Sequence, residues 1–281
     1  MTTPLERPRG SEPPVRRWRP APLLKATLGL HIAGALAIAT YPHAWPWVVT
    51  LLGCNHLLII GSIFCPRGQL LGPNLVRLPA AAAERGEVAL TFDDGPDPFV
   101  TPRVLDLLDR FGMKATFFCV GRKVCAHPDV VEDMVRRGHA IENHSFDHIH
   151  WFAAMDPWRM SRDIENAQSA IARIAGARPG LFRAPNGFRN PWLDAVLARG
   201  ALRYVSWTRR GLDTVRRDAQ AVARALMRDL RAGDVLLMHD GNSGRTTDDQ
   251  PMVLAVLPTL LERLREKGLK SVALRTALET H

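Results

Sequence analysis

Apolar residues are spaced in two different ways along this chain, and the change falls near residue 86. Before it, they form one long run in which no Lys, Arg, Asp or Glu occurs between residues 26 and 64. A membrane-spanning helix needs about 20 residues, so this run is too long for one span and suits two. Residues 41–46 contain two prolines, which interrupt a helix, and aromatic rings typical of a membrane interface. We therefore expect membrane helices near 23–41 and 46–65.

The apolar run has two alternative interpretations. A cleaved signal peptide is disfavoured because the run is long and has no clear cleavage site soon after its first half. A helical hairpin buried against a soluble domain is the other alternative. In front of the run, residues 1–22 are rich in Pro and Arg and predict a disordered basic tail.

From residue 86 onward, short apolar strands alternate with amphipathic helices, after a linker at 66–85. Repeated strand–helix units imply parallel strands with right-handed crossovers. A closed or nearly closed β/α barrel over 86–281 is the natural solution, and an open doubly wound sheet is the alternative. The predicted strands are 88–92, 115–119, 139–143, 181–183, 204–207, 234–238 and 271–274, and the predicted helices are 104–111, 128–137, 157–175, 191–199, 217–231 and 251–267.

Composition supports a folded protein at a membrane. The 281 residues are 46% hydrophobic and 23% charged, which suits a packed core. The net charge of +9 is partly local to the first 25 residues, beside the apolar run, and no basic–aromatic surface pattern points to nucleic acid. We expect the cysteines to be free structural thiols, with pairing of the last two as the alternative: Cys54, Cys65, Cys119 and Cys125.

Unusual polar residues follow several of the predicted strands. All lie at the carboxyl ends of parallel strands, where β/α barrels and open α/β sheets build their active sites. Scattered structural polar residues would have no reason to share that face. The residues are Asp93, Asp94, His144, His148, Arg183, Asp213 and His239.

Two of these groups suggest a metal hydrolase. In H-S-F-D-H the two histidines, His144 and His148, are four residues apart and would bind a metal together with one carboxylate. A cation would neutralise one of the adjacent Asp93 and Asp94 and leave the other as a base toward metal-bound water. His239 would then be a general acid. The alternative for the Asp pair is a plain turn, and for His150 a supporting or surface role.

These motifs, in this order, resemble the polysaccharide deacetylase family with the NodB homology domain, carbohydrate esterase family 4. The resemblance covers residues 86–275 and implies a distorted (β/α)7 barrel there, so the expected fold is this barrel with the membrane hairpin at its N-terminal side. It rests on T-F-D-D-G-P (91–96), H-S-F-D-H (144–148), R-A-P-N-G (183–187) and L-L-M-H (236–239).

The resemblance also implies a role for each matching residue. Asp93 would be the general base held by Arg183, and His239 the general acid tuned by Asp213. The metal ligands would be Asp94, His144 and His148, with Zn²⁺ expected and Co²⁺ or Ni²⁺ accepted by the same ligands. The substrate-binding residues would be Pro185, Asn186, Trp207 and Leu236.

Two motifs depart from the family pattern, at three positions in all. Asn186 stands where the family usually has Tyr. This replacement keeps the backbone N–H that would donate to the oxyanion, but it changes the side chain that lines the glycan-binding wall. In the fourth motif, Arg210 replaces the first Asp and Thr214 replaces Trp. The hydrolytic residues are therefore complete, whereas the glycan-binding wall is altered.

The sequence thus predicts a membrane-anchored, metal-dependent hydrolase of carbon–nitrogen bonds that removes N-acetyl groups from a saccharide or lipid-linked sugar. The alternatives are a deformylase, an O-acetyl esterase, or a catalytically silent module that binds glycan or lipid. We expect a multi-pass protein of a bacterial-type inner membrane. Basic residues before the first span and after the second (Arg67, Arg77) favour a cytoplasmic catalytic domain, with an extracytoplasmic one as the alternative.

Overall fold

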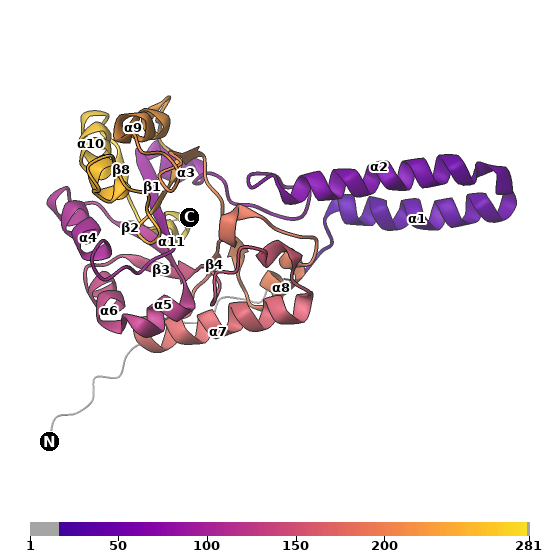
Figure 1. The fold of residues 1–281 in the computed structure, drawn as a ribbon, viewed down its shortest axis with the longest axis horizontal. Coiled ribbons are helices and arrows are strands. Elements are labelled where there is room, and N and C mark those ends of the chain that lie inside the picture. The colour runs from indigo at the N-terminus through magenta and orange to yellow at the C-terminus, as the bar shows by residue number, and fades with distance from the viewer. Residues whose placement is uncertain (1–16, 280–281) are drawn as a thin grey trace, which may run out of the picture.

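The computed structural model describes residues 17–279 and shows two parts, a helical hairpin and an α/β domain (Figure 1). The hairpin consists of α1 (Pro22–Thr40) and α2 (Trp45–Ile63), joined by the short 3-10 helix η1 (Pro42–Ala44). These bounds lie within two residues of the expected spans. Most of the predicted basic tail, residues 1–16, lies outside the described part.

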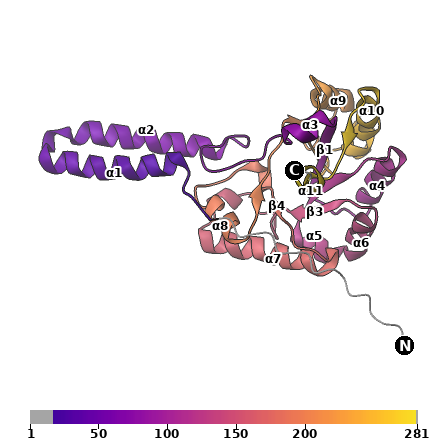
Figure 2. The ribbon, with the colours of Figure 1, turned by 180° about the vertical axis from the view of Figure 1, so that it is seen from behind.

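The hairpin projects from the domain rather than packing along it (Figures 1 and 2). Its two helices hold each other through hydrogen bonds between Thr27 and Asn55 and through the contact of Gly34 with Val48. Both helices are long and apolar enough to cross a membrane, and only 6% of each apolar window is buried. A hairpin buried in a soluble core would be mostly covered, so that alternative does not fit.

The segment predicted as a linker is packed onto the domain. Leu71, Leu78 and Ala82 are buried, the last of them in the short helix α3 (Ala80–Glu84). The backbone of Leu75 forms hydrogen bonds with the two residues that flank Val205. The Leu75 N–H donates to the Tyr204 carbonyl, and the Ser206 N–H donates to the Leu75 carbonyl. This segment therefore ties the hairpin to the barrel.

The domain is a distorted barrel of parallel strands, as predicted. The sheet order is β5-β4-β3-β2-β1-β7-β6, with β8 paired to β1, and every strand pairing is parallel. The strands are β1 (Glu87–Asp93), β2 (Ala115–Cys119), β3 (Ala140–Asn143), β4 (Leu181–Phe182), β5 (Arg203–Tyr204), β6 (Arg209–Arg210), β7 (Val235–His239) and β8 (Lys270–Ser271).

One extended segment joins the two ends of this sheet. Residues 203–204 pair with β4, and residues 209–210 of the same segment pair with β7. Between them the Val205 N–H donates to Phe182, and the Thr208 N–H donates to Val235. The predicted fifth strand is thus two short strands, because the segment leaves one neighbour before it reaches the other.

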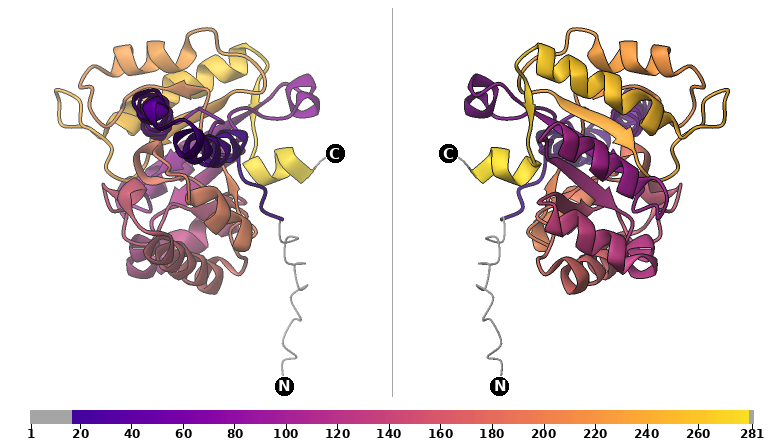
Figure 3. Two further views of the ribbon diagram at one scale, coloured as in Figure 1. Left: turned by 90° about the vertical axis from the view of Figure 1, so that its right-hand side faces the viewer. Right: turned by 90° about the vertical axis from the view of Figure 1, so that its left-hand side faces the viewer.

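Helices cover the outside of the barrel (Figure 3). Most match the predicted ones, but α5 was not predicted, and Leu274 begins α11 instead of ending a strand. The helices are α4 (Thr101–Arg110), α5 (Gly121–Ala126), α6 (Pro128–Arg136), α7 (Pro157–Ala175), α8 (Leu193–Arg199), α9 (Ala219–Met227), α10 (Met252–Glu266) and α11 (Leu274–Glu279), with 3-10 turns η2 (Phe152–Ala154) and η3 (Pro185–Gly187).

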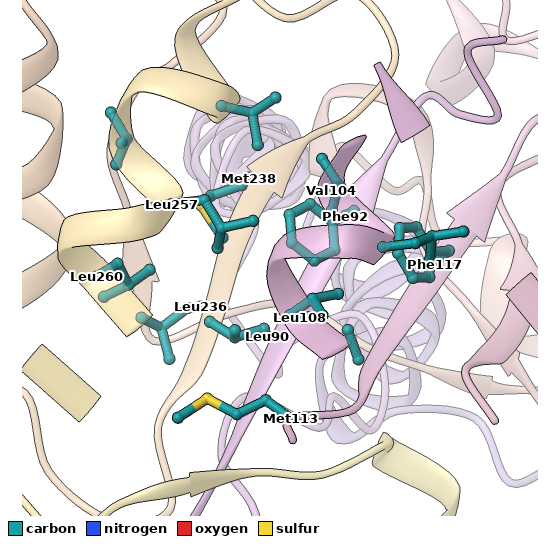
Figure 4. Close-up of a cluster of buried hydrophobic side chains, with 14 of the residues drawn as sticks. Leu90, Phe92, Val104, Leu108, Met113, Phe117, Leu236, Met238, Leu257 and Leu260 are labelled. Atoms are coloured by element: carbon teal, nitrogen blue, oxygen red, sulfur yellow. The ribbon is translucent and has the colours of Figure 1, made fainter. Parts of the chain in front are cut away.

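Side chains alternate between two cores along the strands. Leu90 and Phe92 of β1 point outward into the layer between sheet and helices, where Leu236 and Met238 of β7 meet α10 (Figure 4). The intervening residues point into the barrel, in a cluster that includes Ala89, Leu237 and Trp207. This alternation places Asp93 and His239, the last residues of β1 and β7, at the same mouth of the barrel.

Candidate active site

Asp93 is held by an arginine from the opposite side of the barrel. Arg183 Nη1 donates to Asp93 Oδ1 at 2.6 Å and to Thr91 Oγ1 at 2.9 Å. Its other nitrogens donate to backbone carbonyls of the 203–210 segment, and its guanidinium lies 4.1 Å from the centre of the Phe118 ring. Arg183 is fully buried, so the pair is shielded from solvent and fixed in direction.

Asp94, His144 and His148 gather their ligand atoms at one point. Both imidazole Nε2 atoms lie beside the same carboxylate oxygen, Asp94 Oδ1, at 3.1 Å and 2.9 Å. That oxygen is buried and has no hydrogen-bond partner within residues 17–279.

The donor set fits a divalent cation. His144 Nδ1 bonds the backbone carbonyl of Arg183 at 2.7 Å, so the proton resides there and the Nε2 lone pair is free. Two imidazoles and one carboxylate, with the three ligand atoms within 4.8 Å of one another, form an open site that suits Zn²⁺. The structure holds Asp94 at φ 69° and His148 at φ 52°, a conformation that turns both side chains toward this point.

His239 is positioned by Asp213. Asp213 Oδ2 accepts from the His239 backbone N–H at 2.7 Å, and its Oδ1 lies 2.9 Å from His239 Nδ1. Burial alone would lower the pKa of His239, but the Asp213 carboxylate, with Asp93 and Asp94 nearby, raises it to about 9. The imidazole therefore carries a proton near neutral pH and presents Nε2 to the barrel mouth.

These groups line one pocket of about 380 Å³. Of the predicted substrate-binding residues, Asn186 and Trp207 line it, and His150, expected to support or to lie on the surface, lines it as well. Its lining is Asp93, Asp94, His144, His148, His150, Asn186, Gly187, Trp207, Arg210, Thr214, Leu237, His239 and Asn242.

The prediction for Leu236 was wrong. Its side chain is buried beside Leu257 and Leu260 in the layer under α10 (Figure 4). Leu237 lines the pocket instead, because it is two residues from His239 and so shares its face of β7. Pro185 is also buried and does not line the pocket.

Sequence reasoning missed several residues around the site. Lys123 Nζ donates to the Asp94 carbonyl at 2.8 Å, and Asn242 Nδ2 donates to Asp94 Oδ2 at 3.2 Å. Asp240, next to His239, is buried beneath Gly95 and accepts from Thr101 Oγ1 at 2.5 Å. A polar residue directly after the predicted acid was the one available signal for Asp240, whereas Lys123 and Asn242 carried none.

Comparisons with known proteins agree with this geometry. A family model described as polysaccharide deacetylase matches residues 80–205. A peptidoglycan-N-acetylglucosamine deacetylase of Bacillus cereus is 30% identical over 193 residues, which cover 68% of this chain and 87% of that protein. A chitooligosaccharide deacetylase of Bradyrhizobium sp. is 34% identical over 155 residues, covering 55% and 70%.

A solved structure gives the same result. The family 4 carbohydrate esterase from Streptomyces lividans in complex with acetate superposes with a TM-score of 0.60 at 34% identity, covering 68% of this chain and 95% of that one. Both the expected fold and the expected resemblance are thereby confirmed. The chain belongs to the polysaccharide deacetylase family, whose members are hydrolases of the N-acetyl groups of polysaccharides.

Proposed function

We propose that this protein is a membrane-anchored deacetylase that hydrolyses the N-acetyl amide of a saccharide. The observation that carries the proposal is the convergence of a carboxylate pair, two imidazoles and a third, protonated imidazole in one pocket. A catalytically silent binding module would have no need to keep all five groups at these distances.

Each residue has a distinct task in this proposal. Asp93, fixed by Arg183, accepts a proton from the attacking water through its free oxygen, Oδ2, which lies 3.9 Å from His144 Nε2. His239, protonated through its contact with Asp213, donates a proton to the leaving nitrogen on the other side of the pocket. Acetate and a free amine are the products.

A divalent cation held by Asp94, His144 and His148 would polarise the acetyl carbonyl and make the attacking water acidic. The backbone N–H of Asn186 is the proposed donor to the developing oxyanion. Asn186 adopts φ 58°, a left-handed conformation that Asn tolerates better than most residues, and its side chain donates to the His150 carbonyl at 3.2 Å.

The substrate class follows from the relatives and from the pocket. The similar proteins are named for peptidoglycan N-acetylglucosamine and for chito-oligosaccharides, so an acetylated amino sugar is the expected substrate. The pocket wall departs from the family motifs at Asn186, Arg210 and Thr214. This departure favours a saccharide different from those of the relatives. The second candidate is a different acyl group, namely formyl or O-acetyl.

The hairpin is the proposed membrane anchor. Apolar side chains are exposed along both helices, and soluble proteins rarely expose a continuous apolar surface of this extent to water. Six basic residues precede or begin α1 and Arg67 and Arg77 follow α2, whereas the turn between them has no Lys or Arg, so the positive-inside rule favours a cytoplasmic catalytic domain in this proposal. A reporter fused after His281 would be active only in the cytoplasm, and activity only outside would reverse this orientation.

The activity is tested by acetate release from N-acetylated chito-oligosaccharides and from N-acetylated lipid-linked sugars, with acetate release from O-acetyl analogues and formate release from N-formyl analogues measured beside them. We expect release that disappears when the metal is stripped and returns with Zn²⁺. Release from the formyl or ester analogues alone would replace the deacetylase proposal with the second candidate. Release that persists in stripped protein would contradict the metal-dependent reaction.

A further inference from the structure

A second groove, of about 370 Å³, adjoins the active-site pocket. The two share Trp207 and Arg210, which form the wall between them. The groove contains four arginines and no acidic residue, and its lining is Pro66, Arg67, Trp207, Thr208, Arg209, Arg210, Leu212, Ala225 and Arg228. It is therefore a basic groove that opens beside the catalytic pocket.

Three of these arginines, Arg67, Arg210 and Arg228, form no ion pair in the described residues 17–279 and are available to a ligand. Arg209 is already paired with the buried Asp234 at 2.8 Å. Arg67 donates only to the Thr208 carbonyl, at 3.3 Å, and Arg210 stacks on Trp207 with its guanidinium carbon 5.6 Å from the ring centre. Neither Arg67 nor Arg210 forms an ion pair with a carboxylate in residues 17–279. Their donors face the groove without a protein anion to satisfy them.

The groove lies where the hairpin ends. Phe64, directly after α2, packs edge-on against Phe188 with ring centres 5.2 Å apart. Pro66 lies against Gly187 of the pocket wall, where an added Cβ would be 3.0 Å from Pro66. Arg67 follows immediately. If α2 spans the membrane, these contacts hold the groove at the level of the lipid headgroups.

We propose that this groove binds the phosphate of a lipid-linked saccharide while the acetylated sugar occupies the catalytic pocket. The proposal rests on the proposed function and adds its substrate class. Arginine forks match phosphate geometry, and Arg67 and Arg210 have no carboxylate partner in residues 17–279, so the groove offers a phosphate unpaired donors. The lipid would then continue toward the end of α2 and the bilayer.

Binding tests the groove independently of catalysis. Full-length, metal-stripped protein in neutral detergent is titrated calorimetrically with N-acetylglucosamine 1-phosphate, its neutral methyl glycoside and inorganic phosphate. We expect the sugar phosphate to bind about tenfold or more tightly than the glycoside. The double variant Arg67→Gln/Arg210→Gln should lose that preference, and the control Arg110→Gln, which removes one positive charge at the end of α4, should keep it.

Two binding results would overturn the proposal. One is equal affinity for the two sugars, or a preference that survives in the double variant. The other is inorganic phosphate binding as tightly as the sugar phosphate without competing with it, which would indicate a headgroup or free-phosphate site unrelated to the substrate.

Catalysis supplies the second test. We compare kcat/KM for acetate release from a short-prenyl diphosphate N-acetylglucosamine with that from a neutral chito-oligosaccharide. In Arg67→Gln the ratio of the two values should fall about tenfold, whereas Arg110→Gln leaves it unchanged. An unchanged ratio in Arg67→Gln would overturn the groove assignment. Failure of wild-type protein to hydrolyse either substrate would count against the proposed function alone, because the titration decides the groove.

Discussion

Arg183 and Asp93 form a buried ion pair across the barrel, from β4 to β1, with Nη1 and Oδ1 2.6 Å apart. Arg183 is fully buried, Asp93 is exposed only toward the catalytic pocket, and Phe118 covers the guanidinium. Removing one charge leaves the other buried without a partner, which costs far more than losing an exposed pair. The same ion pair therefore stabilises the barrel and fixes the orientation of the Asp93 carboxylate, the proposed base.

Replacing Arg183 tests this link. We expect Arg183→Met to lower the free energy of unfolding by about 3–5 kcal/mol. The exposed Arg136→Gln, whose ion pair with Asp133 lies on the surface, should change it by less than about 1 kcal/mol. Urea unfolding of the two variants measures the difference. Similar values for both would mean that the buried pair does not have the structural importance assigned to it.

The pH dependence of hydrolysis tests the pairing of His239 with Asp213. The proposed acid must be protonated, so kcat/KM should fall as pH rises through the pKa of His239, raised to about 9 by Asp213 despite burial. A bound cation would oppose this increase, since it offsets the charges of Asp93 and Asp94. In Asp213→Asn the alkaline limb should move toward the ordinary value near 6.5. A limb that stays in place would assign the titration to another group.

Asp240 provides a test that needs no substrate. Burial raises its pKa to about 7, although the hydrogen bond from Thr101 acts in the opposite direction. The folded protein thus binds a proton that the unfolded chain releases near pH 4, so this group favours folding at low pH and loses that contribution as pH rises toward 7. Asp240→Asn should flatten the fall in unfolding free energy over this range and stabilise the protein at pH 8 by up to about 4 kcal/mol. An unchanged pH slope would contradict this.

The sequence predicted those parts of the molecule that have strong local patterns. The bounds of helices α1 and α2 follow from an uninterrupted apolar run, and the long helix α7 follows from its periodicity between the N-cap Asp156 and the left-handed Gly176. The short helices α3, α5 and α11 have too few residues to show a period. The division of 203–210 between two neighbours depends on the tertiary arrangement, which no local pattern contains.

The candidate site also combines residues that a local sequence pattern reveals with residues that only the tertiary arrangement brings together. Adjacent residues in compact motifs, such as Asp93 and Asp94, could be predicted as site residues from their order in the chain, and they line one pocket. Leu236 was assigned wrongly although the two-residue period of a strand, counted back from His239, selects Leu237. The groove beside the pocket could not be predicted, since it joins Arg67, just after the hairpin, to Arg210 of the barrel.

The most direct measurement of the central claim compares two neighbouring carboxylates. Metal content and acetate release are measured together for wild-type protein, Asp93→Asn and Asp94→Asn, each loaded with Zn²⁺ and freed of excess. If Asp94 is a ligand and Asp93 the base, Asp93→Asn keeps one metal and loses release by a factor of about 100 or more, whereas Asp94→Asn loses the metal itself. Equal metal binding by the two variants, or release by Asp93→Asn at the wild-type rate, would contradict the assignment.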